Sequence, residues 1–305
     1  MSAHDLCLLW NWEYDADFVS LLHSSCRSHG ISFLQITPEN LMHHLRVLDE
    51  NQLDFRVFFD RASDTDPRVM PIVRWARYNA AYRINPYEHA TRTWNKATMH
   101  HILTRFCLHT PHTIVLPSYE QQPVLGPLDL SPLGDRFTIK PAHGGGGEGV
   151  VNNATSLSEV ISARRDHPSD GYLLQAHVVS AQLDFRPAWF RVIYCAGKVY
   201  PCWWDSRKRV YTPITMAEES RYRLGELHKT VVSIARICKL DLFSTEISLT
   251  PDGLFVVVDY VNDVLDLRLQ SKTPDGVPDD IVHDIAERLT LLVKRQTPFQ
   301  REYWY

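Results

Sequence analysis

Residues 137–149 read Phe-Thr-Ile-Lys-Pro-Ala-His-Gly-Gly-Gly-Gly-Glu-Gly, an apolar strand pattern followed by a glycine run. Consecutive glycines lack the Cβ atoms that would keep an anion away from successive backbone N–H groups. Lys140, on the strand before the run, can place its ammonium group against the same anion. The run leads to a second strand pattern at Val150 and Val151, and no Gly-Lys-Ser/Thr follows it. This order predicts a flap that can fold over a triphosphate, with a plain flexible turn as the alternative.

A pair of acids, Glu246 and Asp259, lies further along the chain. They fall in two apolar strand patterns, 243–249 and 254–259, joined by a turn at 251–253 that reads Pro-Asp-Gly. A hairpin would place the two carboxylates side by side, where they repel each other and are costly to bury. A bound Mg²⁺ removes that conflict and keeps water and phosphate oxygens as its other ligands. The pattern predicts a magnesium site, with two solvated acids on an exposed face as the alternative.

The first hundred residues alternate between strand and helix patterns. Strands are expected at 6–10, 31–36 and 55–59, with helices at 15–29 and from Pro38 onward. Such alternation predicts a parallel sheet with crossover helices, and ligands bind these sheets at the carboxyl ends of the strands. The polar residues at these ends could either contact a substrate or cap loops and helices, and the sequence favours neither role. They are Asn11, Glu13, Asp60 and Arg61.

The remaining two thirds of the chain mix helix and strand patterns without a simple alternation. Helices are expected at 96–108, 157–164, 224–238 and 280–294. Further strands are expected at 113–117, 137–141, 172–175, 190–196 and 198–204. At 305 residues the chain exceeds one typical core, so several domains are expected. We divide it into a parallel-sheet domain, a domain with the glycine flap and a domain with the acid hairpin, at 1–95, 96–180 and 181–305.

The composition is that of a globular protein, with 44% hydrophobic and 22% charged residues. The formal net charge of −4 provides no basic excess for nucleic-acid phosphates, so no nucleic-acid partner is expected. No apolar run approaches the ~20 residues that span a bilayer, and the first residues lack a signal-peptide pattern, so no membrane association is expected. The six scattered cysteines contain no Cys-x-x-Cys pair and indicate reduced thiols in the cytoplasm.

The chain resembles the ATP-grasp superfamily, which includes D-alanine–D-alanine ligases, glutathione synthetases and ribosomal-protein glutamate ligases. The resemblance rests on four landmarks. The first is an asparagine followed by a lysine at the start of a helix, and the second is a strand that carries a lysine and leads into a glycine-rich flap. The third is a strand that ends in a short hinge, and the fourth is a pair of acids with a glycine in the turn between them, at a fixed spacing. In chain order these are Asn85-Pro86 with Asn95-Lys96-Ala97-Thr98, the flap 137–149, the hinge 172–178, and Glu246, Gly253 and Asp259. The ordered set is more specific than any single landmark.

The resemblance implies an α/β (α+β) ATP-grasp fold with an N-terminal parallel-sheet domain, a central glycine-flap lid and a C-terminal antiparallel-sheet domain. It implies ATP and two Mg²⁺ ions as cofactors, with the metal held by Glu246, Asp259 and Asn262. Lys140 and Arg191 would be catalytic, although Arg191 is equally open to pairing with an acid of its own sheet. The nucleotide would be held by Lys96, Lys140, His143, Gly144, Gly145, Gly146, Gly147, Glu148, Gly149, Gln175, Ala176, His177, Val178 and Asp184.

Some positions near the metal depart from the family pattern or stay open. Residues three apart on a flat strand face opposite ways, so Asn262 needs a bulge or a strand end to join Asp259. Ser244 stands where those ligases carry an arginine, two residues before the first acid. The aromatic stretch 203–207 is open to a substrate-pocket wall or to core packing. Acceptor binding and solvated loop charges are both open for Asp263, Asp266 and Arg268.

The activity that the resemblance implies is an ADP-forming ligase that joins a carboxylate to an amine or thiol through an acylphosphate. The expected partners are a small-molecule carboxylate and an amine, such as an amino acid or a small peptide. Two other classes stay open: a phosphotransferase similar to inositol phosphate kinases, and an ATP-binding module without turnover. A basic acceptor pocket would favour the kinase, and the chain offers a small cluster at 207–209. The oligomeric state is also open, with a homodimer as one alternative.

Overall fold

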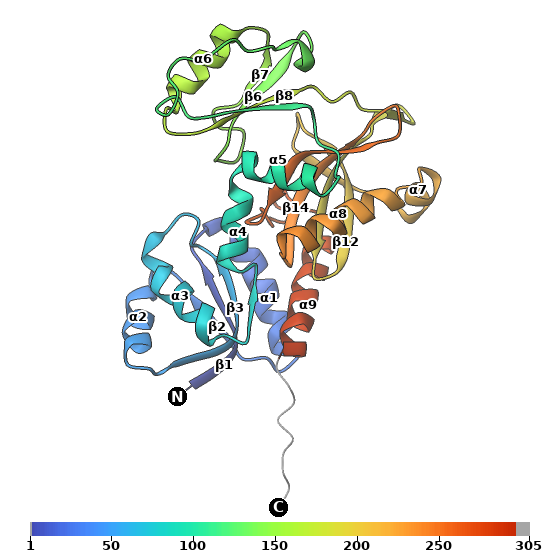
Figure 1. Cartoon of the computed structure of the whole chain (residues 1–305). Helices are drawn as coiled ribbons and strands as arrows, with labels where there is room; N and C mark the ends of the chain where they lie inside the picture. The colour runs from blue at the N-terminus through green and yellow to red at the C-terminus, as the bar shows by residue number, and fades with distance from the viewer. Residues whose placement is uncertain (1, 297–305) are drawn as a thin grey trace, which may run out of the picture.

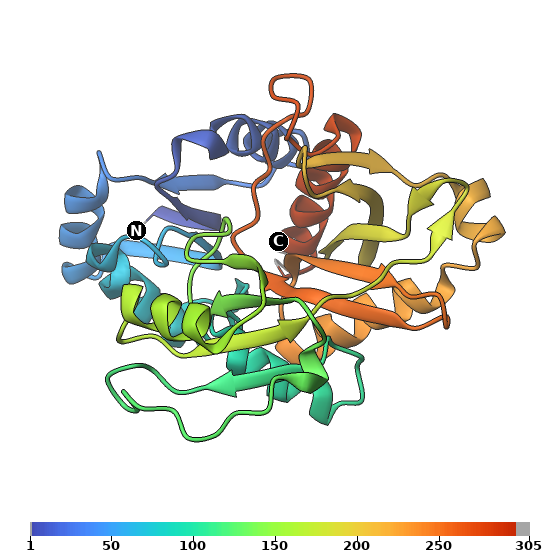
Figure 2. The same ribbon diagram turned by 90° about the horizontal axis from the view of Figure 1, so that it is seen from above.

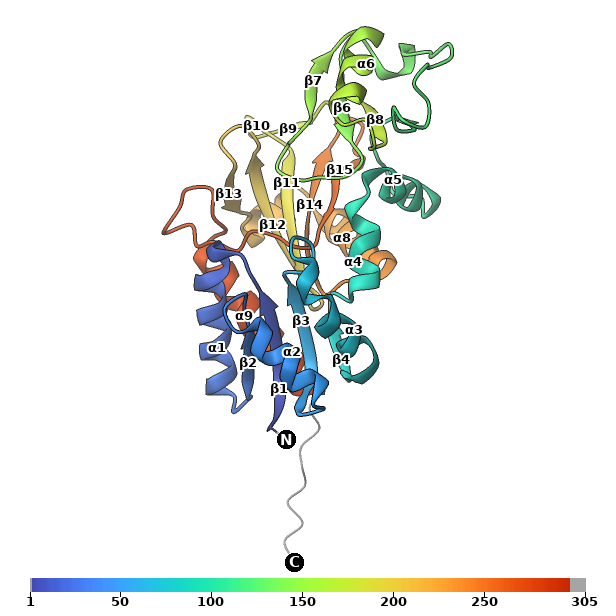
Figure 3. The ribbon, with the colours of Figure 1, turned by 90° about the vertical axis from the view of Figure 1, so that its left-hand side faces the viewer.

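The computed structural model describes residues 2–296 of the 305-residue chain. Three main sheets, which follow one another along the chain, form the body of the molecule (Figure 1). Figure 3 shows them as tiers, with the N-terminal sheet at the bottom, the C-terminal sheet in the middle and the lid sheet at the top. The mixed α/β (α+β) class expected from the sequence is confirmed. Within the described part of the chain, each helix is too short or too polar to cross a membrane.

The N-terminal sheet is parallel throughout, in the order β2-β1-β3-β4, as the alternating patterns predicted. Leu6 and Leu8 of its central strand are buried in one core cluster, and Cys7 and Leu9 in another, so both faces of the sheet are covered. The strands are β1 (Ser2–Trp10), β2 (Phe33–Ile36), β3 (Leu53–Arg61) and β4 (Tyr82–Ile84). The helices are α1 (Ala16–Ser28), α2 (Leu41–Asp49) and α3 (Met70–Asn79), with 3-10 turns at Glu13–Asp15 and Pro67–Val69.

Helix α2 begins at Leu41, so the prediction that Pro38 lies in its first turn was wrong. Asn40 accounts for the difference. Its Oδ1 accepts from the N–H of Thr37 at 2.8 Å, and its Nδ2 donates to the carbonyl of Gln35 at 3.0 Å. These two bonds close a turn that keeps Pro38 outside the helix. Proline is as favourable in such a turn as in the first turn of a helix.

The lid sheet is antiparallel, in the order β5-β8-β6-β7. Phe137 pairs with Ala154, so the glycine run is a loop between two antiparallel strands, as predicted. Seen from above, the lid lies in front of the other two tiers (Figure 2). Its strands are β5 (Thr113–Leu116), β6 (Phe137–Pro141), β7 (Val151–Ala154) and β8 (Tyr172–Ala176); it also has helix α6 (Leu157–Asp166) and a 3-10 turn at Ser131–Leu133.

The C-terminal sheet is antiparallel, in the order β13-β12-β11-β14-β15. Leu227 and Val231 of α8 are buried against Phe190 and Phe243 on one face of the sheet. The strands are β11 (Trp189–Cys195), β12 (Lys198–Asp205), β13 (Val210–Pro213), β14 (Leu242–Leu249) and β15 (Phe255–Asn262), preceded by a small hairpin of β9 (Gln182–Leu183) and β10 (Arg186–Pro187). The helices around it are α4 (Tyr87–Trp94), α5 (Lys96–Arg105), α7 (Met216–Arg221) and α8 (Gly225–Cys238).

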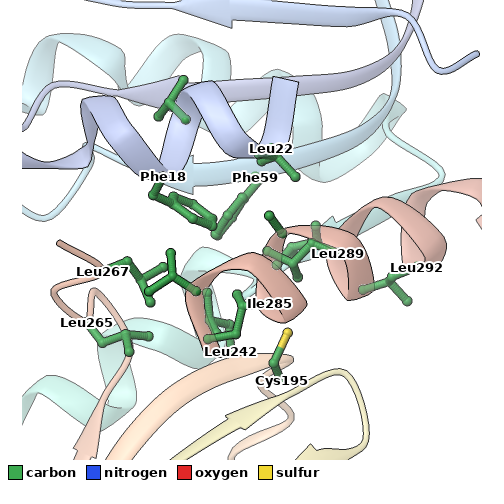
Figure 4. Close-up of a cluster of buried hydrophobic side chains, with 14 of the residues drawn as sticks. Phe18, Leu22, Phe59, Cys195, Leu242, Leu265, Leu267, Ile285, Leu289 and Leu292 are labelled. Carbon is green, nitrogen blue, oxygen red and sulfur yellow. The ribbon is translucent and has the colours of Figure 1, made fainter. Parts of the chain in front are cut away.

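The last described helix, α9 (Asp279–Gln296), packs against the first helix of the chain. Phe18 and Leu22 of α1 meet Ile285 and Leu289 of α9, and all four side chains are fully buried (Figure 4). Truncating one such leucine to alanine typically costs about 2–5 kcal/mol. The contact therefore joins the first and third predicted domains tightly, and the domain boundaries themselves stay predictions.

The six cysteines are free thiols, and Cys107 is the exposed one. Burial raises the pKa of the Cys202 thiol to about 12, and it raises the pKa of Cys238 to about 12 as well. Thiols with such high pKa values are largely protonated and poorly nucleophilic at neutral pH. The buried cysteines therefore act as small apolar core residues.

Candidate active site

The glycine flap is a solvent-exposed loop whose shape depends on residues without a Cβ. Residues 143–148 are exposed, and Gly144, Gly146, Gly147 and Gly149 have positive φ angles. At Gly149, with φ of +67°, an added Cβ would also lie 3.1 Å from the His167 ring. Other residues would be strained there, so the run is needed for the path of the backbone and is more than a flexible turn.

The start of the flap is anchored from two sides. Asn95 caps α5 by accepting from the N–H of Thr98 at 2.8 Å, and its Nδ2 lies 3.1 Å from Nε2 of His143. On the other side of the same ring, Nδ1 of His143 lies 2.8 Å from Asp170. The Nζ of Lys96, the first residue of α5, donates to the carbonyl of Gly144. The predicted Asn95-Lys96 landmark and the flap therefore lie in direct contact.

The hairpin of β14 and β15 brings the predicted metal ligands together. Glu246 lies opposite Asp259 in the register, and Ser244 lies opposite Asn262. Three positions on β15 thus match two on β14, which is the bulge that Asn262 required. As a result Nδ2 of Asn262 donates to Oδ2 of Asp259 at 2.9 Å.

The two acids of this hairpin have opposite pKa shifts. Burial raises the pKa of Glu246, although the charge of Arg191 opposes the shift. Burial also tends to raise the pKa of Asp259, but the nearby charge of Lys140 and the hydrogen bond from Asn262 outweigh it and hold that pKa below its usual value. Lys140 acts on both acids, and its Nζ lies 3.5 Å from the carbonyl of Val258 on β15. The flap lysine and the acid hairpin therefore face the same space.

Arg191 of β11 forms an ion pair with Glu246, with Nη1 of Arg191 2.9 Å from Oε1. The pairing alternative raised for this arginine is thus present, and its catalytic role stays a proposal. Trp189 donates from Nε1 to Oε2 of Glu246 at 3.2 Å. The guanidinium of Arg191 lies 4.9 Å from the ring centre of Trp204, a cation–π distance. Burial lowers the pKa of Arg191, but Tyr211 and Glu246 outweigh it, so the arginine stays charged.

A cavity of about 300 Å³ is lined by part of the predicted phosphate and metal residues, while Lys140 and Glu246 are not among its lining residues. Its walls include Trp94 and Asp263, which hydrogen-bond to each other at 3.0 Å. A second cavity, of about 370 Å³, lies along the flap at Glu148 and Asp170. The predicted residues around the first cavity are Lys96, His143, Gly144, Gly145, Asp259 and Asn262.

The predicted adenine hinge is the end of β8, between two strands of the lid. The N–H of Ala176 donates to the carbonyl of His112 at 2.9 Å, so this N–H already has a partner within the protein. Gln175 is buried, and its Nε2 donates to the hydroxyl of Tyr260 at 2.7 Å. Tyr260, which sequence analysis missed, follows Asp259 directly and ties the hinge to the metal strand. His177 and Val178 lie just beyond the strand end.

Several other predicted residues are engaged in local or structural contacts. Asp184 forms an exposed ion pair with Arg221 at 2.7 Å and accepts from the Tyr222 hydroxyl at 2.6 Å. Asp60 accepts from the backbone N–H groups of residues 62 and 63, which is the loop capping considered for it. Further ion pairs join Arg61 to Asp15 and Arg268 to Asp266 and Asp275.

Sequence analysis also missed a contact between the C-terminal sheet and the flap. Arg209, in the turn between β12 and β13, donates from Nη2 to the carbonyl of Gly146 at 3.1 Å. The small basic cluster at 207–209 was noted only as a kinase feature. No local signal could have found this contact, because the two residues are 63 positions apart.

Comparison with solved structures identifies the architecture. D-alanine–D-alanine ligase from Bacillus anthracis, complexed with ATP, has a TM-score of 0.64 at 14% identity, over 96% of this chain and 99% of that one. Macrocyclase MdnC from Microcystis aeruginosa MRC, bound with precursor peptide MdnA, has a TM-score of 0.64 at 10% identity, over 94% and 99%. A RimK domain protein ATP-grasp from Sphaerobacter thermophilus DSM 20745 has a TM-score of 0.62 at 16% identity, over 93% and 97%. A scan of protein-family models finds no match, and a search of curated proteins finds no significant match.

The three tiers, with a glycine lid above an antiparallel sheet, thus have the ATP-grasp fold. At these identities the likeness establishes the fold, and it extends over nearly the whole of each neighbour. The resemblance inferred from residues 85–262 is confirmed at that level. The expected arrangement of parallel-sheet domain, glycine lid and antiparallel-sheet domain is confirmed with it.

Proposed function

We propose that this protein is an ATP- and Mg²⁺-dependent ligase that joins a carboxylate to an amine or thiol with release of ADP. One observation carries the proposal: Lys96, the start of the glycine flap and Asp259 line one cavity, and Lys140 lies close enough for its charge to act on both Asp259 and Glu246. Phosphoryl transfer needs such a grouping of cations and metal-binding carboxylates. Neighbours named as a D-alanine–D-alanine ligase and as a macrocyclase bound with a precursor peptide support an amino acid or small peptide as substrate. The free thiols support a cytoplasmic location.

Each part of the site has a proposed role toward the nucleotide. Lys96 and Lys140 would bind the α- and β-phosphates, and the flap 143–149 would close over the β/γ end. The backbone around Gln175, Ala176 and Val178 would meet the adenine. For Ala176 this leaves its carbonyl, because its N–H already donates to His112. Asp184 would reach the ribose after release from Arg221.

The acid hairpin fits a magnesium site. Asp259, with its lowered pKa, is ionised at neutral pH, and Glu246 lies opposite it. Asn262 uses its Nδ2 on Asp259, which leaves its Oδ1 as a third ligand. Residues 2–296 hold no group of three His, Cys, Asp or Glu side chains placed for a metal, so phosphates and water would supply the remaining ligands. Two bound Mg²⁺ ions would neutralise charge on the phosphates.

The proposed chemistry has two steps. The carboxylate of the substrate attacks the γ-phosphate, the bond to ADP breaks, and an acylphosphate forms. The amine then attacks the acyl carbon and phosphate leaves. Lys140 would stabilise the charge that develops on the transferring phosphate, and Arg191 would stabilise the oxyanion of the second step. Closure of the flap would exclude water, which would otherwise hydrolyse the acylphosphate.

The test is a screen of amino acids, small carboxylates and short peptides for ADP release, with mass spectrometry of the products. A condensed product with free phosphate supports the ligase, and hydroxylamine should trap the acylphosphate as a hydroxamate. A phosphorylated alcohol would instead indicate the phosphotransferase, and ATP binding without any ADP release would indicate the binding module. Lys140→Met should abolish ADP release, whereas Lys229→Met, at an exposed pair with Glu226, should leave it unchanged.

A further inference from the structure

A cavity of about 640 Å³ lies between β10 and the turn that joins β12 to β13. This volume falls within the usual range for small-molecule sites, about 300–1,000 Å³. Three tryptophans line it: Trp189 and Trp204 are partly exposed, whereas Trp203 is 6% exposed and packs against Phe190 in the core. Their flat apolar faces suit an aromatic or other planar ligand group.

Two of these tryptophans also touch the candidate catalytic pair. Trp189 donates to Glu246 at 3.2 Å, and Trp204 lies 4.9 Å from the guanidinium of Arg191. The wall formed by Trp189 and Trp204 therefore contacts both the cavity and the Arg191–Glu246 pair. A substrate whose reacting carboxylate lies near Glu246 can extend its remaining atoms along this wall.

The cavity carries an excess of positive charge. Arg186, Arg207 and Lys208 line it together with one acid, Asp205. Asp205 already accepts from the N–H groups of Arg207 at 3.0 Å and Lys208 at 3.1 Å, which holds the turn. Within residues 2–296 none of the three cations forms an ion pair with a carboxylate. The whole chain has a net charge of −4, so this positive excess is a local property of the surface.

We propose that this cavity holds the non-reacting part of the carboxylate substrate, an aromatic body that carries a second negative charge. The inference rests on the proposed ligase function and names its substrate class. Trp189 and Trp204 pack against the aromatic body, and the Arg207 and Lys208 side chains bind the second anionic group. The neighbouring Arg209 contacts Gly146 of the flap, so closure of the flap also covers the substrate end of the site.

Calorimetric titration of the full-length protein with three dipeptides tests the proposal. Phe-Glu carries both the ring and the extra carboxylate, Phe-Gln lacks the charge, and Ala-Glu lacks the ring. We expect Phe-Glu to bind about tenfold more tightly than either of the others. Arg207→Ala and Lys208→Ala should each weaken Phe-Glu binding about tenfold and leave Phe-Gln binding unchanged. A purely structural defect would weaken both ligands, and Arg27→Ala, at an exposed position on α1, should weaken neither.

Equal affinity for the three dipeptides, no detectable binding, or full Phe-Glu affinity in both variants would overturn the proposal. The titration needs no turnover, so its result is independent of ADP release. If Phe-Glu binds selectively but no carboxylate yields ADP, the ligase function fails and the cavity assignment stands. If ADP release proceeds with carboxylates that lack the ring and the second charge, the cavity assignment fails and the ligase function stands.

Discussion

Two arginine–carboxylate pairs in this molecule have the same chemistry and different surroundings. In the pair of Arg61 and Asp15 the side chains are 1% and 0% exposed, with two hydrogen bonds at 2.7 and 2.6 Å and a third from Arg61 to the carbonyl of Leu265 at 2.9 Å. In the pair of Arg191 and Glu246 the side chains are 20% and 15% exposed, with one short bond at 2.9 Å. The first pair is buried between the N-terminal sheet and the loop after β15.

The difference indicates which pair can change partners. Arg61 is surrounded by protein and joins two parts of the chain that are 204 residues apart. Glu246 shares its carboxylate with Trp189 and faces Asp259 across the hairpin, beside the charge of Lys140. A ligand can replace contacts only at the second pair. We therefore expect loss of stability from changes at the first pair and loss of activity from changes at the second.

The largest expected effect on stability is that of Asp15→Asn. The change leaves the charge of Arg61 buried without its counter-ion, which costs about 3–5 kcal/mol of unfolding free energy. Urea denaturation followed by circular dichroism measures it. The matched control is Asp184→Asn at the exposed pair with Arg221, where less than about 1 kcal/mol is expected. Equal losses in the two variants would contradict the contrast drawn between buried and exposed pairs.

The largest expected effect on activity is that of Glu246→Gln. The amide keeps the shape of the side chain but loses the charge that a magnesium site needs, so ADP release should fall about 10³-fold. Chelation of Mg²⁺ by EDTA should abolish ADP release from the wild-type protein. The thermal midpoint of Glu246→Gln should stay above that of Asp15→Asn. Full activity in the glutamine variant would remove Glu246 from the proposed metal site.

We expect the carboxyl group of Asp263 to make the unfolding free energy depend on pH. Burial raises the pKa of its carboxyl to about 6, against the hydrogen bond from Trp94. Because the folded-state pKa lies above the unfolded value, the stabilisation from the protonated form is full below about pH 4 and is lost as the pH rises through 6. Asp263→Asn, which is neutral throughout, should therefore raise the unfolding free energy by up to about 3 kcal/mol at pH 7.5 and leave it unchanged at pH 4. Denaturation at both pH values, without Mg²⁺, checks this, and a gain at pH 4 of the same size would argue against it.

The smallest expected effect is that of Arg209→Ala. The variant removes the contact with Gly146 at an exposed position, so the closed flap should lose less than about 1 kcal/mol. We expect the KM for ATP to rise about twofold to fivefold with little change in kcat. Arg105→Ala, at an exposed position on α5, serves as the control. A large fall in kcat would instead place Arg209 among the residues that contact the transferring phosphate.

Local sequence patterns predicted the elements that carry the site. The glycines of 144–149, the capping Asn95 and the turn at 251–253 act on their immediate neighbours, so their effects are visible in a short stretch of chain. The prediction that used one proline to locate the start of a helix was wrong. Pro38 suits both a turn and a first helical turn, and the hydrogen bonds of Asn40 decided between them.

The partners of the site residues could not be predicted in the same way. Arg191 pairs with Glu246 across 55 positions, and Gln175 bonds to Tyr260 across 85. The requirement for a bulge at Asn262 followed from strand geometry, but the bulge itself depends on how β14 and β15 pair. Such contacts depend on sheet register and on the packing of distant segments.

The sequence by itself determined that this chain has a glycine flap preceded by a lysine strand and an acid hairpin, because backbone conformation and charge are local properties of those residues. The tertiary structure alone decided that Lys140 lies near Glu246 and Asp259, that α9 packs against α1, and that Trp189 contacts Glu246. The physical reason is that burial and pairing depend on which surfaces meet, and these surfaces lie far apart along the chain.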